Sequence, residues 1–175
     1  MKRLRVLALL VTCAFGLARD AVAQTPSAAV TADAVVVTVG MTITTLRDLA
    51  FGTVIKGVAT TVQPTAATAG AWQVAGSGNA FIIISFTLPT ALTNIQALPG
   101  STIPIAFNGT SARWNRATNN AAAGTPFNPA VGTVGRLGPP ANPNMYIWIG
   151  GTVSPAAAAK PGIYQGTAIV SLIYQ

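Results

Sequence analysis

The sequence has no histidine and only one cysteine, Cys13, in 175 residues. Its only carboxylate side chains are Asp20, Asp33 and Asp48. No metal site can be assembled from this set, since zinc and calcium sites need several His, Cys, Asp or Glu ligands. No base is present to activate a serine nucleophile. Acid–base catalysis would need two carboxyls in one cleft with separated pKa values, whereas Asp33 and Asp48 are expected on the solvated surface. The inventory predicts a protein that is not an enzyme and that uses no cofactor and no metal.

The first 23 residues have the layout of a secretory signal peptide. Residues 1–5 are basic, residues 6–17 are mostly apolar, and Ala21 and Ala23 form a small-x-small end before Gln24. The apolar run is shorter than the about 20 residues that a spanning helix needs. An amphipathic structural helix and a lipoprotein site at Cys13 are the alternatives, and Thr12 disfavours the second. We expect cleavage after Ala23, no transmembrane segment afterwards, and a secreted chain that passes through the periplasm to the cell surface.

The processed chain has few charges and no cysteine. It keeps six cations against Asp33 and Asp48, so its net charge is 6 − 2 = +4. The cations are scattered, and only Arg113 and Arg116 are close together. Without a basic stripe, we expect no nucleic-acid partner. About 150 residues can bury a sufficient core without a disulfide.

Short runs of alternating or apolar residues, separated by turn residues, predict an all-β protein. No helical period of useful length occurs, and prolines confine residues 156–159 to one helical turn at most. The strand at 81–88 is expected at the centre, and Pro104 indicates an edge strand at 102–107. Residues 119–144 are interpreted as a long surface excursion with one short strand at 131–137. Other strands are expected at 58–62, 71–75, 145–149 and 162–175. The fold prediction is an immunoglobulin-like β-sandwich in one domain, residues 37–175.

The last stretch, residues 162–175, has one apolar face and no following segment to pair with its far edge. That face comprises Tyr164, Gly166, Ala168, Val170, Leu172 and Tyr174. We expect it to be an acceptor edge that needs a neighbouring strand.

The tail at residues 24–36 has its own alternation. Val30, Ala32, Ala34 and Val36 are apolar at even positions, whereas apolar residues at 35–43 take odd positions. Such a phase change swaps the faces of a strand, so a bulge or two separate strand segments are expected near residue 35. The four even residues make the tail a candidate donor strand.

Three tryptophans are candidates for a sugar-binding face. Trp148 lies in a strong strand and is expected in the core, and Trp72 fits either role. Trp114, between Arg113 and Arg116, is the best candidate for an exposed aromatic residue, with core packing as the alternative.

Two groups of residues resemble a known family. Residues 46–54, LRDLAFGTV, look like an element near the start of a family of secreted bacterial domains of unknown function. Residues 149–153, IGGTV, and residues 161–174, from PGIYQGT to the end IVSLIY, resemble that family's ending. The same ending is similar to spore-coat-protein-U-like subunits, which include the archaic chaperone–usher pilins. The 119–144 segment and the absent cysteine pair depart from the pilin pattern.

The resemblance implies a function. In the pilin relatives an immunoglobulin-like domain lacks its last strand, and the N-terminal segment of the next subunit fills the gap. A pilin-like structural subunit of a filament, pilus or surface coat is therefore implied. Its partners would be copies of itself, head to tail, or related subunits, together with a periplasmic chaperone and an outer-membrane usher. The alternative is a monomeric secreted binding module whose glycan- or surface-adhesion face contains Trp114 and the long loop. Donation within one chain or between two chains stays open.

Overall fold

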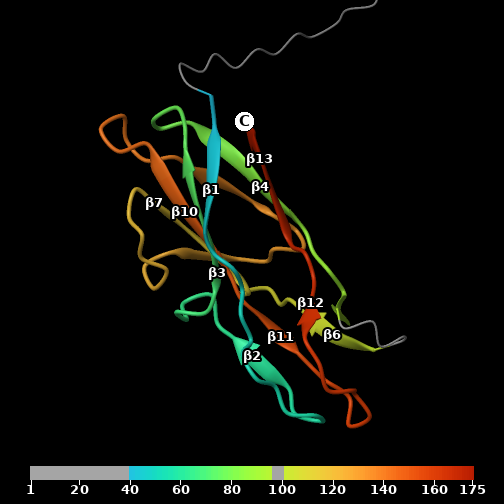
Figure 1. Ribbon diagram of the computed structural model, residues 1–175. Coiled ribbons are helices and arrows are strands. Elements are labelled where there is room, and N and C mark those ends of the chain that lie inside the picture. The colour runs from blue at the N-terminus through green and yellow to red at the C-terminus, as the bar shows by residue number, and fades with distance from the viewer. Residues whose placement is uncertain (1–39, 96–100) are drawn as a thin grey trace, which may run out of the picture. The chain divides into compact units, whose positions relative to one another are not determined.

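The computed structural model describes residues 40–95 and 101–175, which all fall in one compact unit (Figure 1). The expected signal peptide, the tail at 24–36 with Val30, Ala32, Ala34 and Val36, and the phase change near residue 35 lie outside the described residues. Described residues form strands and turns without a helix, so the all-β prediction is confirmed. Accordingly, no helix within 40–95 or 101–175 is long and apolar enough to cross a membrane.

The strands form three antiparallel sheets that pack together as a β-sandwich. The sheet orders are β1-β3-β10-β7-β8, β12-β5-β6-β11-β2 and β13-β4-β9. The strands are β1 (Thr42–Arg47), β2 (Thr60–Val62), β3 (Gly70–Ala75), β4 (Phe81–Thr87), β5 (Ala91–Asn94), β6 (Thr102–Ala106), β7 (Ala112–Arg116), β8 (Thr125–Phe127), β9 (Thr133–Arg136), β10 (Asn144–Ile149), β11 (Gly151–Val153), β12 (Tyr164–Gln165) and β13 (Ile169–Tyr174). Only Gly150 separates β10 from β11, so an almost continuous strand contributes β10 to the β1 sheet and β11 to the β12 sheet.

Apolar side chains at alternate positions build two core clusters. The larger lies between the β1 and β13 sheets and includes Val74, Ile82, Ile84 and Ile147, all fully buried. The smaller centres on Ile103, Ile105 and Val153. Trp148 is 2% exposed, which confirms its predicted place in the core.

The prediction that Pro104 places its strand at an edge was wrong. Strand β6 lies between β5 and β11, in the interior of its sheet. Pro104 accepts a hydrogen bond at its carbonyl from the Ser154 amide, 3.0 Å away. Proline lacks an N–H, but its partner Ser154 lies one residue past the end of β11, so the missing donor falls beyond the paired strand. Pro104 and Ser154 form the next pair of the β6–β11 register, so the proline removes only the return bond at the end of this ladder.

Residues 119–144 lie largely at the surface, and the short strand predicted at 131–137 is confirmed as β9, but the segment is attached to the core more firmly than its composition indicated. Two short strands, β8 and β9, attach the segment to β7 and β4, respectively. Phe127 is 7% exposed and Leu137 is completely buried, and both belong to the larger core cluster. Pro129 is also fully buried. A few well-placed apolar residues are enough to hold a segment rich in Ala, Gly, Pro and Asn against the core.

The final stretch is two strands and not one. Tyr164 and Gln165 form β12, which pairs with β5, whereas β13 pairs with β4 in another sheet. The chain crosses between the two sheets at residues 166–168. Even-numbered apolar positions continue through this crossing, so the alternation alone does not show the break.

Candidate functional site: an open groove

The two end segments of the described unit are less buried than most of the chain between them. We call residues 40–59 the N-terminal wall and residues 161–175 the C-terminal wall. Neither wall contains a single buried residue, although both carry large apolar side chains. Ile43 is 44% exposed and Ile173 is 62% exposed. All buried residues belong to the chain between the walls. The apolar side chains of the two walls therefore remain partly or fully exposed to solvent.

Strand β1 carries the N-terminal wall and is an edge strand that pairs with β3 alone. Ile43 lies opposite Val74, which is fully buried, and residues directly opposite in antiparallel strands point to the same face. Ile43 therefore points toward the interior but remains largely exposed. No described segment covers the inner face of β1, as a complete sandwich would require.

Strand β13 carries the C-terminal wall and pairs with β4 alone. Val170 and Leu172 are half-buried against the larger core cluster, and Ile169 and Ile173 point outward. The Gln175 amide donates to the Phe81 carbonyl on β4, 3.0 Å away. Because backbone groups alternate along a strand, the N–H and C=O groups of Val170 and Leu172 point to the other edge. That edge faces no strand among the described residues, so it can accept one.

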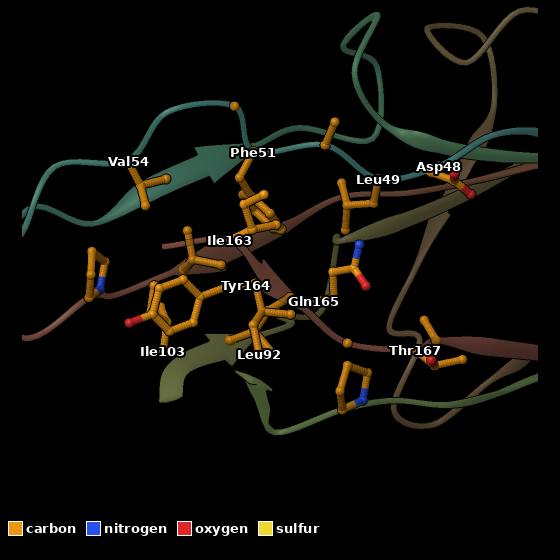
Figure 2. A pocket seen from close by; sticks show the side chains of 18 of the residues that line it. Asp48, Leu49, Phe51, Val54, Leu92, Ile103, Ile163, Tyr164, Gln165 and Thr167 are labelled. Atoms are coloured by element: carbon orange, nitrogen blue, oxygen red, sulfur yellow. The ribbon is translucent and has the colours of Figure 1, made fainter. Parts of the chain in front are cut away.

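Between the walls lies a groove of about 1010 Å³. Figure 2 shows Leu49, Phe51 and Val54 on one side and Ile163, Tyr164 and Gln165 on the other. Leu92 and Ile103 lie on the far side of Ile163 and Tyr164 in this view, and they belong to, or pack on, the smaller core cluster. The groove is therefore an open depression that both walls line with a mixture of apolar and polar side chains.

Charged residues lie at two places on the groove. Arg47 and Asp48 are neighbours on the N-terminal wall, and Lys56 and Lys160 belong to the loops beside Tyr164. The Gly57 amide donates to the Pro155 carbonyl at 2.8 Å, which holds these two loops together. In the part of the chain that the structure describes, Asp48 is the only acidic side chain and neither lysine forms an ion pair. We call the Lys56 and Lys160 region the lysine end of the groove.

Tyr164 marks the lysine end by its hydrogen bonds. Its hydroxyl donates to the Lys160 carbonyl at 2.7 Å and bonds to the Ser101 hydroxyl. The Ser101 hydrogen bond lowers the pKa of Tyr164 below its ordinary value, and the positive charge of Lys56 acts in the same direction.

The Tyr164→Phe variant tests this geometry by pH titration. The tyrosinate absorbance that the variant loses is expected to develop with a midpoint below pH 10.0, the ordinary value. Subtracting the variant's titration from that of the parent isolates Tyr164 from the other tyrosines. A difference curve with its midpoint at or above the ordinary value would contradict the described contacts.

The three residues of the predicted ligand face do not form one surface. Trp114 packs against the larger core cluster, and its Nε1 is buried without a partner in the described residues. An Arg113 Nη1 donates to the carbonyls of Ala121, Ala122 and Gly124, which fastens the 120–124 loop.

Arg116 has a separate structural role. It donates to the Leu137 carbonyl at 2.9 Å and to the Asn79 side chain, so it links β7 to the chain around β4 and β9. Its Asn79 partner has a φ of 65°, the left-handed region that asparagine tolerates.

The predicted acceptor-edge residues are split: Tyr164, Gly166 and Ala168 line the groove, whereas Val170, Leu172 and Tyr174 lie beyond it in β13. A Cβ at Gly166 would lie 2.8 Å from the Leu92 side chain. Val170, Leu172 and Tyr174 are half-buried in β13, and Ala168 is half-buried beside it. The sequence did not predict that residues 48–54 and Leu92 line a groove. The spacing of the apolar residues Leu49, Phe51 and Val54 was the sequence feature that could have indicated it.

Fold and groove together define a β-sandwich domain whose core is left open between two edge segments. The chain belongs to the family described as "Domain of unknown function (DUF4402)", whose model matches residues 41–174. That match includes most of the N-terminal wall and nearly all of the C-terminal wall. A comparison with curated proteins gives no match, and neither does a comparison with solved structures.

Proposed function

We propose that this protein is a structural subunit of an extracellular filament, pilus or surface coat, assembled by strand donation. The donor is the tail at residues 24–36 of one copy, and the acceptor is the groove of the next copy. One observation carries the proposal: two long apolar walls flank the core, and neither contains a buried residue. Secretion through the periplasm, an outer-membrane usher with its chaperone, and kinship with pilin and spore-coat subunits belong to the same proposal.

A donated strand would pair with the open strand edge and would cover the exposed apolar side chains. Its backbone would pair with the open edge of β13, which is β-augmentation. Its inward side chains, Val30, Ala32, Ala34 and Val36, would cover the exposed inner faces of the walls. Each larger side chain contributes about 1–3 kcal/mol on burial, and each ladder hydrogen bond contributes about 1 kcal/mol. The sum is a large part of the stability of a domain this size.

The lengths of donor and groove agree. The C-terminal wall from Tyr164 to Tyr174 spans about 33 Å if extended, and a tail of 13 residues spans about 43 Å. The tail can therefore occupy the whole groove and still leave a short connection to its own domain.

The polarity of the donated strand decides what kind of assembly results. Thr42 pairs with Ala75 and Tyr174 with Ile82, and these partners flank the β3–β4 turn. Strand β1 therefore begins at the end of the domain where β13 ends (Figure 1). The C-terminal end of a donor parallel to β13 would lie at this end, close to the start of β1. The donor could then belong to the same chain, or two chains could exchange donors in a closed dimer. A donor antiparallel to β13 would leave at the opposite end and connect subunits head to tail, which makes a filament. Antiparallel pairing is slightly more stable per residue.

Deletion of residues 24–36 tests the proposal. The intact chain is expected to form multimers that size-exclusion chromatography and electron microscopy detect. The deletion variant is expected to remain monomeric, with a melting temperature lower by roughly 10 °C, because about 1 kcal/mol corresponds to 2–4 °C at this size.

Two double variants provide a matched control for the deletion. Val30→Asp with Val36→Asp places charges at the inward positions and is expected to prevent assembly. Thr31→Asp with Val35→Asp places the same charges at outward positions and is expected to be tolerated. If the deletion variant assembles and melts like the intact chain, strand donation by this tail is ruled out.

The second hypothesis, a monomeric binding module with Trp114 on its ligand face, has no specific support. Trp114 packs against the core, and the neighbouring Arg113 is occupied by three loop carbonyls.

A further inference from the structure

We propose that Asp33 of the donated tail binds at the lysine end of the groove and thereby sets the register and the polarity of the donated strand. This inference rests on the proposed function, because its occupant is the tail of a second copy. It adds a charged contact to an interface that is otherwise apolar. Such a contact selects among alignments that small apolar side chains barely distinguish.

The first observation is the uneven charge of the groove. Figure 2 shows Val54 and Tyr164 toward one end and Asp48 and Thr167 toward the other. Lys56 and Lys160 lie with Tyr164, as the Tyr164 hydrogen bond to the Lys160 carbonyl shows. Asp48 is adjacent to Arg47, so the charges at that place offset each other. The lysine end carries two positive charges and no acid among the described residues.

The second observation is the charge of the tail. Residues 24–39 contain one charged side chain, Asp33, and no cation. In each subunit, then, Asp33 is the only charged side chain of the tail, and the positive α-amino group that cleavage would leave on Gln24 lies nine residues before it. The groove has one positive end without an acid among the described residues. Since opposite charges attract and the described acid Asp48 would repel Asp33, the lysine end is the favoured place for this carboxylate.

The third observation is register. Residues directly opposite each other in an antiparallel pair share a face, so inward Val30 and Ala32 must align with even-numbered wall residues. If Gln24 lies opposite Tyr174, the position numbers of opposing residues sum to 198. Asp33 then lies opposite Gln165, next to Tyr164 and the two lysines. The same alignment uses the whole length from Tyr174 to Tyr164.

The reverse polarity does not bring these charges together. A tail that turned directly into β1 at Gly40 would run parallel to β13 and would finish at the end of the domain where β13 finishes. Asp33 is only seven residues before Gly40, so it would lie at the level of β13. No charged side chain occurs at positions 169–175 or 41–45 to receive it.

Engineered disulfides test the register and the polarity in the full chain. The Cys13→Ser background leaves only the introduced cysteines, because Cys13 is the chain's only cysteine. The pair Thr31→Cys with Thr167→Cys keeps Asp33 and joins residues that lie opposite each other in the same alignment. It is expected to give a ladder of linked multimers on a non-reducing gel, since neighbouring strands bring Cα atoms within disulfide range. The pair Thr31→Cys with Ser171→Cys is the matched control and is expected to stay unlinked.

The outcomes separate the two proposals. A ladder from the Ser171 pair and none from the Thr167 pair would overturn this inference and leave strand donation standing. If neither pair links and deletion of residues 24–36 leaves assembly unchanged, strand donation itself fails. Links confined within single chains would show self-filling and would also overturn the inference.

Charge reversal provides a second readout. Lys56→Glu with Lys160→Glu is expected to weaken assembly about four- to 25-fold, because each exposed charge contact contributes up to about fivefold. Adding Asp33→Lys to that double variant is expected to restore assembly. Higher salt should weaken the parent's assembly and not that of an Asp33→Asn variant. If Asp33→Lys fails to restore assembly in variants that melt like the parent, the charge contact is ruled out.

Discussion

Replacing Val170 with proline is expected to abolish assembly while leaving the subunit folded. The Val170 N–H points to the open edge of β13, because Gln175 and the alternate residues before it bond to β4. Proline removes that donor and places its ring where a donated strand must approach. Its ring also keeps an apolar group against the core, as Val170 does.

Ser171→Pro is the matched control, one residue along the same strand. The Ser171 N–H faces β4, where Ser171 lies opposite Ser85. Proline there removes a ladder hydrogen bond inside the domain and is expected to lower the free energy of unfolding by at least about 1 kcal/mol. Melting curves measure the fold, and chromatography measures the assembly. Equal assembly by the Val170→Pro variant and the parent would show that the β13 edge is not the acceptor.

Gly150→Ala is expected to destabilise the domain by about 3 kcal/mol or more, at the upper end of overpacking costs. A Cβ at this position would lie 2.1 Å from the Val62 carbonyl oxygen and 2.8 Å from the Pro64 nitrogen. Both atoms are backbone and cannot move without shifting β2. The Gly150 amide also donates to the Ser111 carbonyl at 2.7 Å, which holds the crossing from β10 to β11 in place.

Gly109→Ala is the control for this effect, since nothing lies within 4 Å of a Cβ built there. Urea or thermal unfolding of both variants is the measurement, and a difference of roughly 10 °C in melting temperature is expected. Equal stability of the two variants would show that the close approach between Gly150 and β2 does not exist in solution.

The strongest strands were predictable because their side chains alternate or are uniformly apolar. Strands β3, β4 and β10 contain Trp72, Ile84 and Ile147 at the centre of such runs, and all three were expected. Strands β5 and β8 were not, because Ala91–Asn94 and Thr125–Phe127 carry too little apolar signal. The position of Pro104 inside a sheet depends on where β11 ends, and that is a long-range property. Local pattern therefore predicts strands but not their neighbours.

The candidate site shows the same division. The alternation of Val170, Leu172 and Tyr174 marks one wall, and it can be read in the sequence. The opposite wall, with Leu49, Phe51 and Val54, becomes a wall only when the chain brings residues about 110 positions apart to the two sides of one groove. Trp114 looked like an exposed aromatic residue beside two arginines, yet its strand turns the ring toward the core and the arginines to backbone carbonyls.

The presence of a single carboxylate side chain, Asp48, among the described residues has a consequence for behaviour in acid. Acid unfolding comes mainly from carboxylates and histidines whose protonation differs between the folded and the unfolded chain. With no histidine in the sequence and one carboxylate side chain among the described residues, the described domain has few groups through which acidity could act on its fold. Such a domain stays folded where most proteins begin to lose structure, so acid would act on the contacts of its tail before it acted on the domain.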